Sequence, residues 1–130
     1  MKFADLVQSA DWKTEKHVPV IDAPEIIAAN EKFRIKVSVG KEIAHPNTTE
    51  HHIRWIKLYF KPDGAKFGIE VASFEYNAHG ESVEGANKGP LYADPGSCVS
   101  VKLAASGVLI ATAYCNIHGV WESEKAITVQ

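Results

Sequence analysis

The stretch Tyr114-Cys115-Asn116-Ile117-His118-Gly119 joins two runs that read as β-strands, residues 108–114 and 120–129. Cys115 and His118 are three positions apart on a tight loop, so a thiolate and an imidazole can both turn toward one metal ion. Zinc sites use short spacings of this kind, and copper electron-transfer sites pair one Cys with two His. Alone, the pair also fits a buried core cysteine beside an unrelated histidine. The positions of the other histidines therefore decide its meaning.

The rest of the chain predicts a β-protein. Phe33-Arg34-Ile35-Lys36-Val37-Ser38-Val39 alternates apolar and polar residues, which is the clearest strand signal. Further strands are expected at 53–60, 69–76 and 98–103, with a short sheet-edge run at 18–21. Short strands, Gly/Pro turns and little helical periodicity predict an all-β, immunoglobulin-like antiparallel β-sandwich.

The segments between these strands carry weaker signals. Residues 1–16 show no clear strand and at most one helical turn near Phe3, and 24–30 reads as a connector. Ser106-Gly107 reads as a hairpin-like turn into 108–114. Residues 77–96 form a long Gly/Pro-containing loop, and loops of that length are often functional or part of an interface.

Composition restricts the function classes. The 130 residues, 45% hydrophobic and 23% charged, suit a single domain spanning 1–130. A net charge of −2 and scattered basic residues indicate no nucleic-acid partner. No apolar run approaches the roughly 20 residues of a membrane span, and the start does not read as a signal peptide. We therefore expect a cytoplasmic protein, and a reducing compartment argues against a disulfide between Cys98 and Cys115.

Histidines precede or follow strands in three separate loops. His17 lies before the run at 18–21, His45 and His51 lie in the loop before 53–60, and His118 follows Cys115. If these loops meet at one end of the sandwich, four imidazoles and one thiolate converge. Five such ligands are too many for a closed tetrahedral zinc site, and imidazole suits iron, copper, nickel and zinc alike. A five-coordinate metal also leaves a sixth position open.

Some polar residues have simpler readings. His51 and His52 are adjacent at a strand start and face opposite ways, so at most one reaches a given metal, and spacing favours neither. His79 reads as a surface residue of the long loop, and Cys98 reads as a small core residue. Glu15 and Lys16 read as solvated charges on the residue pattern alone.

Three segments resemble the superoxide reductases, in particular the single-domain neelaredoxin class related to desulfoferrodoxin. They are Asp11-Trp12-Lys13-Thr14-Glu15-Lys16-His17-Val18-Pro19-Val20, the segment from Gly40 to Ile53 around His45-Pro46-Asn47-Thr48-Thr49-Glu50-His51-His52, and Tyr114-Cys115-Asn116-Ile117-His118-Gly119-Val120-Trp121-Glu122. The resemblance continues through the intervening strands and covers nearly the whole chain.

The resemblance implies an oxidoreductase that reduces superoxide by one electron to hydrogen peroxide without releasing dioxygen. One mononuclear non-haem iron, cycling between Fe²⁺ and Fe³⁺, would be held in a plane by His17, His45, His51 and His118, with the Cys115 thiolate axial. Glu15 would cap the sixth position in the oxidised resting form, and Lys16 would attract superoxide. The family also implies rubredoxin as electron donor and a homotetrameric assembly.

Two other classes fit parts of the pattern. A copper electron carrier also places a Cys and a His on one loop of a β-sandwich, but it usually adds an axial Met near that loop. The only methionine here is Met1. A β-sandwich binding module with a structural zinc needs only four ligands, and it leaves one His, Glu15 and Lys16 without a role.

Overall fold

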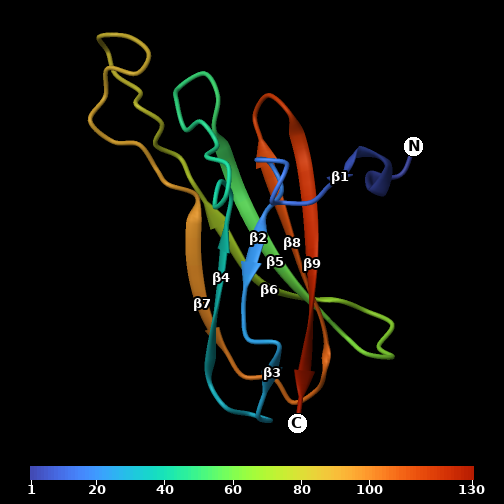
Figure 1. Ribbon diagram of the computed structural model, residues 1–130. Helices are drawn as coiled ribbons and strands as arrows, with labels where there is room; N and C mark the ends of the chain where they lie inside the picture. Colours follow the sequence, from blue (N-terminus) through green and yellow to red (C-terminus); the bar gives the residue numbers. More distant parts are fainter.

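Two β-sheets pack face to face in the computed structural model, which describes residues 1–130 (Figure 1). The larger, six-stranded sheet has the order β1-β9-β8-β5-β6, with β3 also paired to β9, and the smaller sheet has the order β2-β4-β7. The strands of the larger sheet are β1 (Gln8–Ser9), β3 (Ile26–Ile27), β5 (Ile53–Pro62), β6 (Ile69–Glu75), β8 (Gly107–Cys115) and β9 (Gly119–Val129). The strands of the smaller sheet are β2 (Val20–Asp22), β4 (Phe33–Ser38) and β7 (Gly96–Val101). The expected antiparallel β-sandwich is confirmed.

The alternation read in the sequence sets which side chains enter the core. In β4, Ile35 and Val37 are buried and the alternating residues Arg34 and Lys36 are exposed. In β8, every second residue from Gly107 to Cys115 is buried, as period-two geometry requires. Both sheets contribute to one apolar cluster, whose most buried members include Ile35, Val37, Ile53, Ile56, Leu58, Leu109, Ala111, Ala113, Cys115 and Ile127. Cys115 is therefore the last inward position of β8, at the end of the core.

Three expectations about local structure need correction. The connector at 24–30 contains β3, and residues 1–16 contain β1; both are two-residue strands that pair in parallel with β9, too short to carry a period-two pattern. Ser106-Gly107 does not join a hairpin, because β7 pairs with β4 in the smaller sheet while β8 pairs with β5 and β9. The chain crosses between the sheets at that point. The short helical turn near the N-terminus is present as a 3-10 helix, Phe3–Leu6.

The loops that carry histidines meet at one end of the sandwich. In Figure 1 the segment before β2, the β4–β5 loop and the β8–β9 turn lie together at the top of the view, and the loop between β6 and β7 extends beyond them. No helix in the structure is long and apolar enough to cross a membrane.

Candidate metal centre

Each loop brings its donor to the same point for a local reason. His17 lies three residues before β2 and is buried with Val18, Pro19 and Val20. Cys115 ends β8 at an inward position, and Gly119, in the left-handed region with φ 84°, turns the chain back into β9. His45 and His51 lie in the β4–β5 loop, His45 buried and His51 half-buried.

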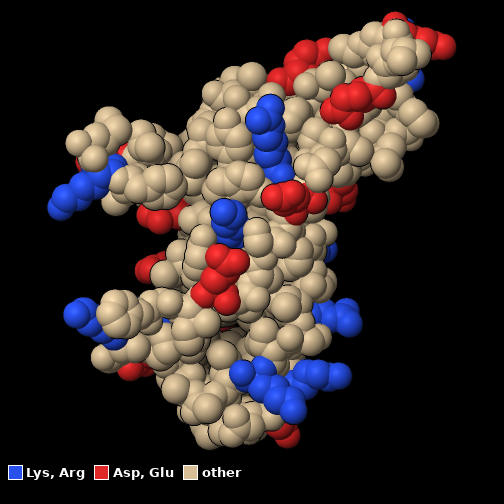
Figure 2. Space-filling view, turned by 180° about the vertical axis from the view of Figure 1, so that it is seen from behind, with Lys and Arg blue, Asp and Glu red and all other residues tan.

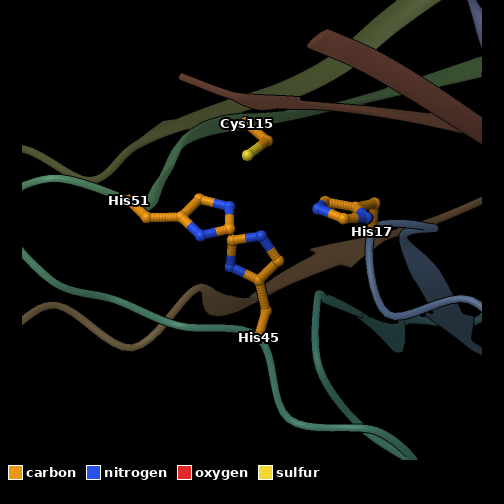
Figure 3. A group of neighbouring side chains, drawn as sticks. All are labelled: His17, His45, His51 and Cys115. Carbon is orange, nitrogen blue, oxygen red and sulfur yellow. The ribbon is translucent and has the colours of Figure 1, made fainter. Parts of the chain in front are cut away.

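Four of the predicted donors form one group. The ligand atoms of His17, His45, His51 and Cys115 all lie within 4.8 Å of one another. Figure 3 shows the three rings and the sulfur turned toward a common space, with the sulfur entering from one side. The structure thus brings together side chains that are distant in the sequence.

His118 adds a fourth imidazole through its Nδ1 atom. This nitrogen lies 3.1 Å from Nε2 of His17 and 3.2 Å from Nε2 of His51. It lies 3.8 Å from the sulfur of Cys115. Unlike His45, His118 is exposed to solvent, so one side of the centre borders the surface.

The four rings are arranged around a square. Neighbouring centroids are 4.6 to 5.0 Å apart in the order His17, His45, His51, His118 and back to His17. The centroids of His17 and His51 are 6.1 Å apart, the separation of a diagonal pair. Such an order leaves Cys115 as the donor that is not part of the square.

Hydrogen bonds behind two of the rings fix which nitrogen faces the centre. The Nδ1–H of His45 donates to the carbonyl of Pro46 at 2.5 Å. The Nδ1–H of His17 donates to Oε1 of Glu15 at 2.6 Å. In the neutral form of each ring these bonds leave Nε2 unprotonated and facing the centre, and hydrogen bonds of this kind are found behind metal-bound imidazoles.

These nitrogens fit a bound cation. Nε2 of His45 is buried and has no hydrogen-bond partner, although buried polar atoms are rarely left unpaired. The Nδ1 atom of His118 lies 3.1 and 3.2 Å from the Nε2 atoms of His17 and His51, so one cation placed among them can accept lone pairs from all three rings. Imidazole and thiolate donors together suit iron, copper, nickel or zinc.

Burial favours the neutral form of two of the rings, His45 and His51. Burial lowers the pKa of His45 to about 4. Burial, followed by the neighbouring charge of His118, also lowers the pKa of His51. A neutral imidazole is the form that binds a metal, so both rings are in the binding form at neutral pH.

The two charged residues of the N-terminal segment take different places. The carboxylate of Glu15 accepts hydrogen bonds from Nδ1 of His17 and from the His17 backbone N–H, at 2.6 and 3.2 Å, and lies outside the four-residue donor group. These bonds to His17 lower the pKa of Glu15. Lys16 is half-buried, and its charge contributes to the lowered pKa values of His45 and His51.

Trp121 is a supporting residue that the sequence reasoning missed. Its ring stacks on His17, with centroids 5.2 Å apart and planes inclined by 18°, and its Nε1–H donates to the backbone carbonyl of His118 at 3.0 Å. It therefore contacts residues from two of the three converging segments. An aromatic residue three positions after His118 was the available signal.

Two readings from the sequence are wrong. His79 is buried, not on the surface, and lies against His52 away from the donor group. Cys98 is exposed, not in the core, because it pairs with the outward-facing Lys36 on β4. Of the adjacent pair, His51 belongs to the donor group and His52 does not, which agrees with the expectation that at most one of them reaches a given metal.

Known proteins resemble this chain over its full length. Residues 9–124 match the desulfoferrodoxin family. The neelaredoxin of Megalodesulfovibrio gigas is 56% identical over 130 residues, covering 100% of both chains. The superoxide reductase of Pyrococcus furiosus is 51% identical, covering 95% of this chain and 98% of its own. A solved structure of the Archaeoglobus fulgidus superoxide reductase (neelaredoxin) in the reduced form superimposes with a TM-score of 0.87 at 52% identity, covering 95% and 98% of the two chains.

Proposed function

Because this chain belongs to the desulfoferrodoxin family, we propose that it is a single-domain superoxide reductase. The reaction transfers one electron to superoxide and takes up two protons, giving hydrogen peroxide and no dioxygen. The observation that carries the proposal is the convergence of four imidazoles and one thiolate at one end of the sandwich. Relatives that match nearly the whole chain are named for this activity.

The proposed resident metal is one iron ion. His17, His45, His51 and His118 would hold it through the nitrogens that face the centre, and Cys115 would give the fifth bond. Iron bound there would supply the electron by passing from the ferrous to the ferric state. The four neutral rings leave the positive charge of the metal largely uncancelled, which favours an anionic substrate.

The role proposed for Cys115 is to set how readily the electron leaves. A thiolate pushes electron density onto a metal more strongly than imidazole does. The sulfur is buried and accepts a hydrogen bond from the backbone N–H of His118 at 3.4 Å. Such a bond withdraws some density from the sulfur and tunes its donation.

Lys16 and Glu15 are proposed to act on the substrate side. The half-buried ammonium of Lys16 would raise the local concentration of the superoxide anion, as steering charges do. The Glu15 carboxylate would cover the open position in the oxidised form and otherwise remain on Nδ1 of His17, which it orients here.

The electron is proposed to come from a rubredoxin-like carrier. His118 and Ile117 are exposed, so a carrier that docks over the β8–β9 turn approaches the centre by its most accessible side. Lys16, Lys41 and Lys88 are the proposed basic contacts for an acidic carrier. Of these, Lys41 is partly neutralised by Asp22, whose Oδ1 lies 2.6 Å from the Lys41 Nζ.

The proposal also covers the number of subunits and the cellular location. We propose a homotetramer, supported by apolar side chains that stand exposed at the N-terminus and in the β6–β7 loop, namely Phe3, Leu6, Val83 and Leu91. A cytoplasmic location suits the two free cysteines. Light scattering of the purified protein measures the mass of the assembly directly.

The test is metal content together with the visible spectrum before and after an oxidant is added. One iron per chain, with an absorption band from the sulfur-to-iron transition only in the oxidised form, is the expected result. Cys115→Ser should abolish the band, while Cys98→Ser, which changes the exposed cysteine, should leave it unchanged. Zinc without a visible band would return the chain to the metal-stabilised binding modules, and an intense blue copper colour would favour an electron carrier.

A further inference from the structure

The β6–β7 loop, residues 76–95, forms an ordered arm rather than a structureless connection. Backbone hydrogen bonds run across it from Gly80 N–H to Leu91 O at 2.9 Å, from Gly89 N–H to Gly80 O at 2.9 Å and from Ala93 N–H to Ala78 O at 2.7 Å. Gly80 has φ 75° and its Cα lies against the ring of Tyr92, where a Cβ would collide. In Figure 2 the arm projects at the upper right and carries several acidic side chains.

One face of the arm holds the turn that presents His51. In this turn the Thr48 N–H donates to the His51 carbonyl at 2.9 Å, and the His51 N–H donates to the Thr48 hydroxyl at 3.1 Å. Thr49 and Glu50 form the tip of the turn. The position of this tip therefore sets the direction in which His51 leaves the backbone.

Asn87 of the arm contacts both residues of the tip. Its Oδ1 accepts from the Thr49 N–H at 2.8 Å, and its own N–H donates to the Thr49 hydroxyl at 3.0 Å. Its Nδ2 donates to both carboxylate oxygens of Glu50, at 2.9 and 2.8 Å. Asn87 adopts a left-handed conformation with φ 61°, which asparagine tolerates better than most residues. Nearly every polar group of this one residue is directed at the tip.

The opposite side of the turn is held by Asn116, the residue after Cys115. Its Nδ2 donates to the Glu50 carbonyl at 2.9 Å, and its Oδ1 accepts from the His52 N–H at 2.9 Å. The turn with His51 thus lies between two asparagines, one from the arm and one from the loop of the thiolate. Asn116 therefore connects the turn that carries His51 to Cys115, which directly precedes it in the chain.

The arm has a second attachment close to its base. The Thr49 hydroxyl donates to the His79 carbonyl at 2.6 Å, and the rings of His79 and His52 stack. Thr49 is therefore fixed from two points of the arm, at His79 and at Asn87.

We propose that Asn87 is a positioning residue of the metal centre, which sets the orientation of His51 and, through Glu50 and Asn116, its relation to Cys115. The inference rests on the proposed iron site but not on the reaction with superoxide. Residues that orient a metal ligand typically change metal affinity by about 10- to 100-fold when removed. The individual bonds are exposed, so their joint effect on orientation matters more than the stability that each adds.

The experiment compares the iron-loaded wild type with Asn87→Gly, which keeps the left-handed backbone accessible and removes only the side chain. Iron release to an excess of chelator is expected to be about tenfold faster, and the sulfur-to-iron band of the oxidised form should shift. Asn77→Gly is the matched control, because Asn77 is exposed in the same arm and its side chain takes no part in the hydrogen bonds that hold the 48–52 turn.

A second variant separates the two contacts of the side chain. Asn87→Asp keeps an acceptor for Thr49 but opposes a carboxylate to Glu50, and it should also accelerate release and shift the band. A band and release rate equal to those of the wild type in both variants, even with a lower melting temperature, would overturn the proposal. If the wild type itself binds no iron, it is the proposed function that fails, before any variant is compared.

Discussion

The imidazole ring of His79 lies flat on that of His52, with centroids 3.6 Å apart and planes inclined by only 7°. Nε2–H of His79 donates to the Tyr76 carbonyl at 2.7 Å, and Nδ1–H of His52 donates to the Thr48 carbonyl at 2.9 Å. These bonds are compatible with two neutral rings, which can stack without charge repulsion. The pair joins the arm to the strand that begins directly after the metal-centre loop.

Removing the His79 ring should destabilise the fold. His79→Ala deletes a buried ring and its bond to Tyr76, so we expect the free energy of unfolding to fall by about 1–3 kcal/mol. His79→Phe keeps a stacking ring and should lose less. Urea denaturation of both variants measures the difference, with Asn77→Ala as the exposed control. Equal midpoints for His79→Ala and the wild type would show that the stack contributes nothing to stability.

The same residue should make stability depend on pH. Burial lowers the pKa of His79 from its ordinary value of 6.5; His52 and Arg54 lower it further, while the Tyr76 carbonyl and Glu81 oppose the shift. The unfolded chain therefore binds the proton more readily, so the contribution of His79 is complete above pH 6.5 and is lost as the pH falls below it.

Denaturation midpoints of the iron-loaded wild type and His79→Phe, measured from pH 7.5 to pH 5, test this dependence. The wild type should lose stability more steeply over that interval, because all other titrating groups are common to both proteins. Parallel curves would refute a contribution of His79.

Two substitutions can distinguish the two roles of Glu15, the proposed cap of the open position and the hydrogen bond that orients His17. Glu15→Ala should leave superoxide reduction nearly intact and change the visible spectrum of the ferric form, because the carboxylate proposed to cap the open position is removed. Glu15→Gln keeps an oxygen acceptor for Nδ1–H of His17 but is a poor ligand. A ferric spectrum that changes in Glu15→Ala and not in Glu15→Gln would assign the carboxylate to orienting His17 alone.

Lys16 should govern the encounter with superoxide. Lys16→Glu reverses the charge that is proposed to attract the anion, and we expect the second-order rate constant to fall by about tenfold at low salt and its salt dependence to weaken. Pulse radiolysis at several ionic strengths gives both quantities. Lys102→Glu makes the same change in net charge just after β7, away from the metal centre, and should have little effect. An unaltered rate for Lys16→Glu at low salt would remove Lys16 from this role.

The sequence predicted what depends on local period and missed what depends on tertiary neighbours. Alternation in β4 follows from one buried face and was readable from the sequence, whereas the inward position of Cys115 became clear only from the alternating burial of β8 in the structure. Strand parity also separated His51 from His52. The exposure of Cys98 was not readable, because a small cysteine in a weakly alternating strand does not show which face of that strand packs against the opposite sheet.

His79 illustrates the other limit. A histidine in a Gly/Pro-containing loop looks solvated, and only the folding of the arm onto the 48–52 turn buries it. The same long-range contact gives Asn87 its partners, 38 positions away from Thr49. No spacing rule relates such residues, whereas the convergence of the histidine loops followed from the ends of the strands that they join.

His17 and His118 are 101 positions apart in the chain, and their nitrogens meet only after the segments from both sheets have docked. The unfolded chain therefore offers no comparable binding site, and the proposed ferrous ion would act on the folding equilibrium by mass action. A ligand at a hundredfold excess over its dissociation constant raises the free energy of unfolding by about 2.7 kcal/mol. If iron is the resident metal, as proposed, the melting temperature should rise with the concentration of free iron, and chains made during iron starvation should be the most readily unfolded and degraded.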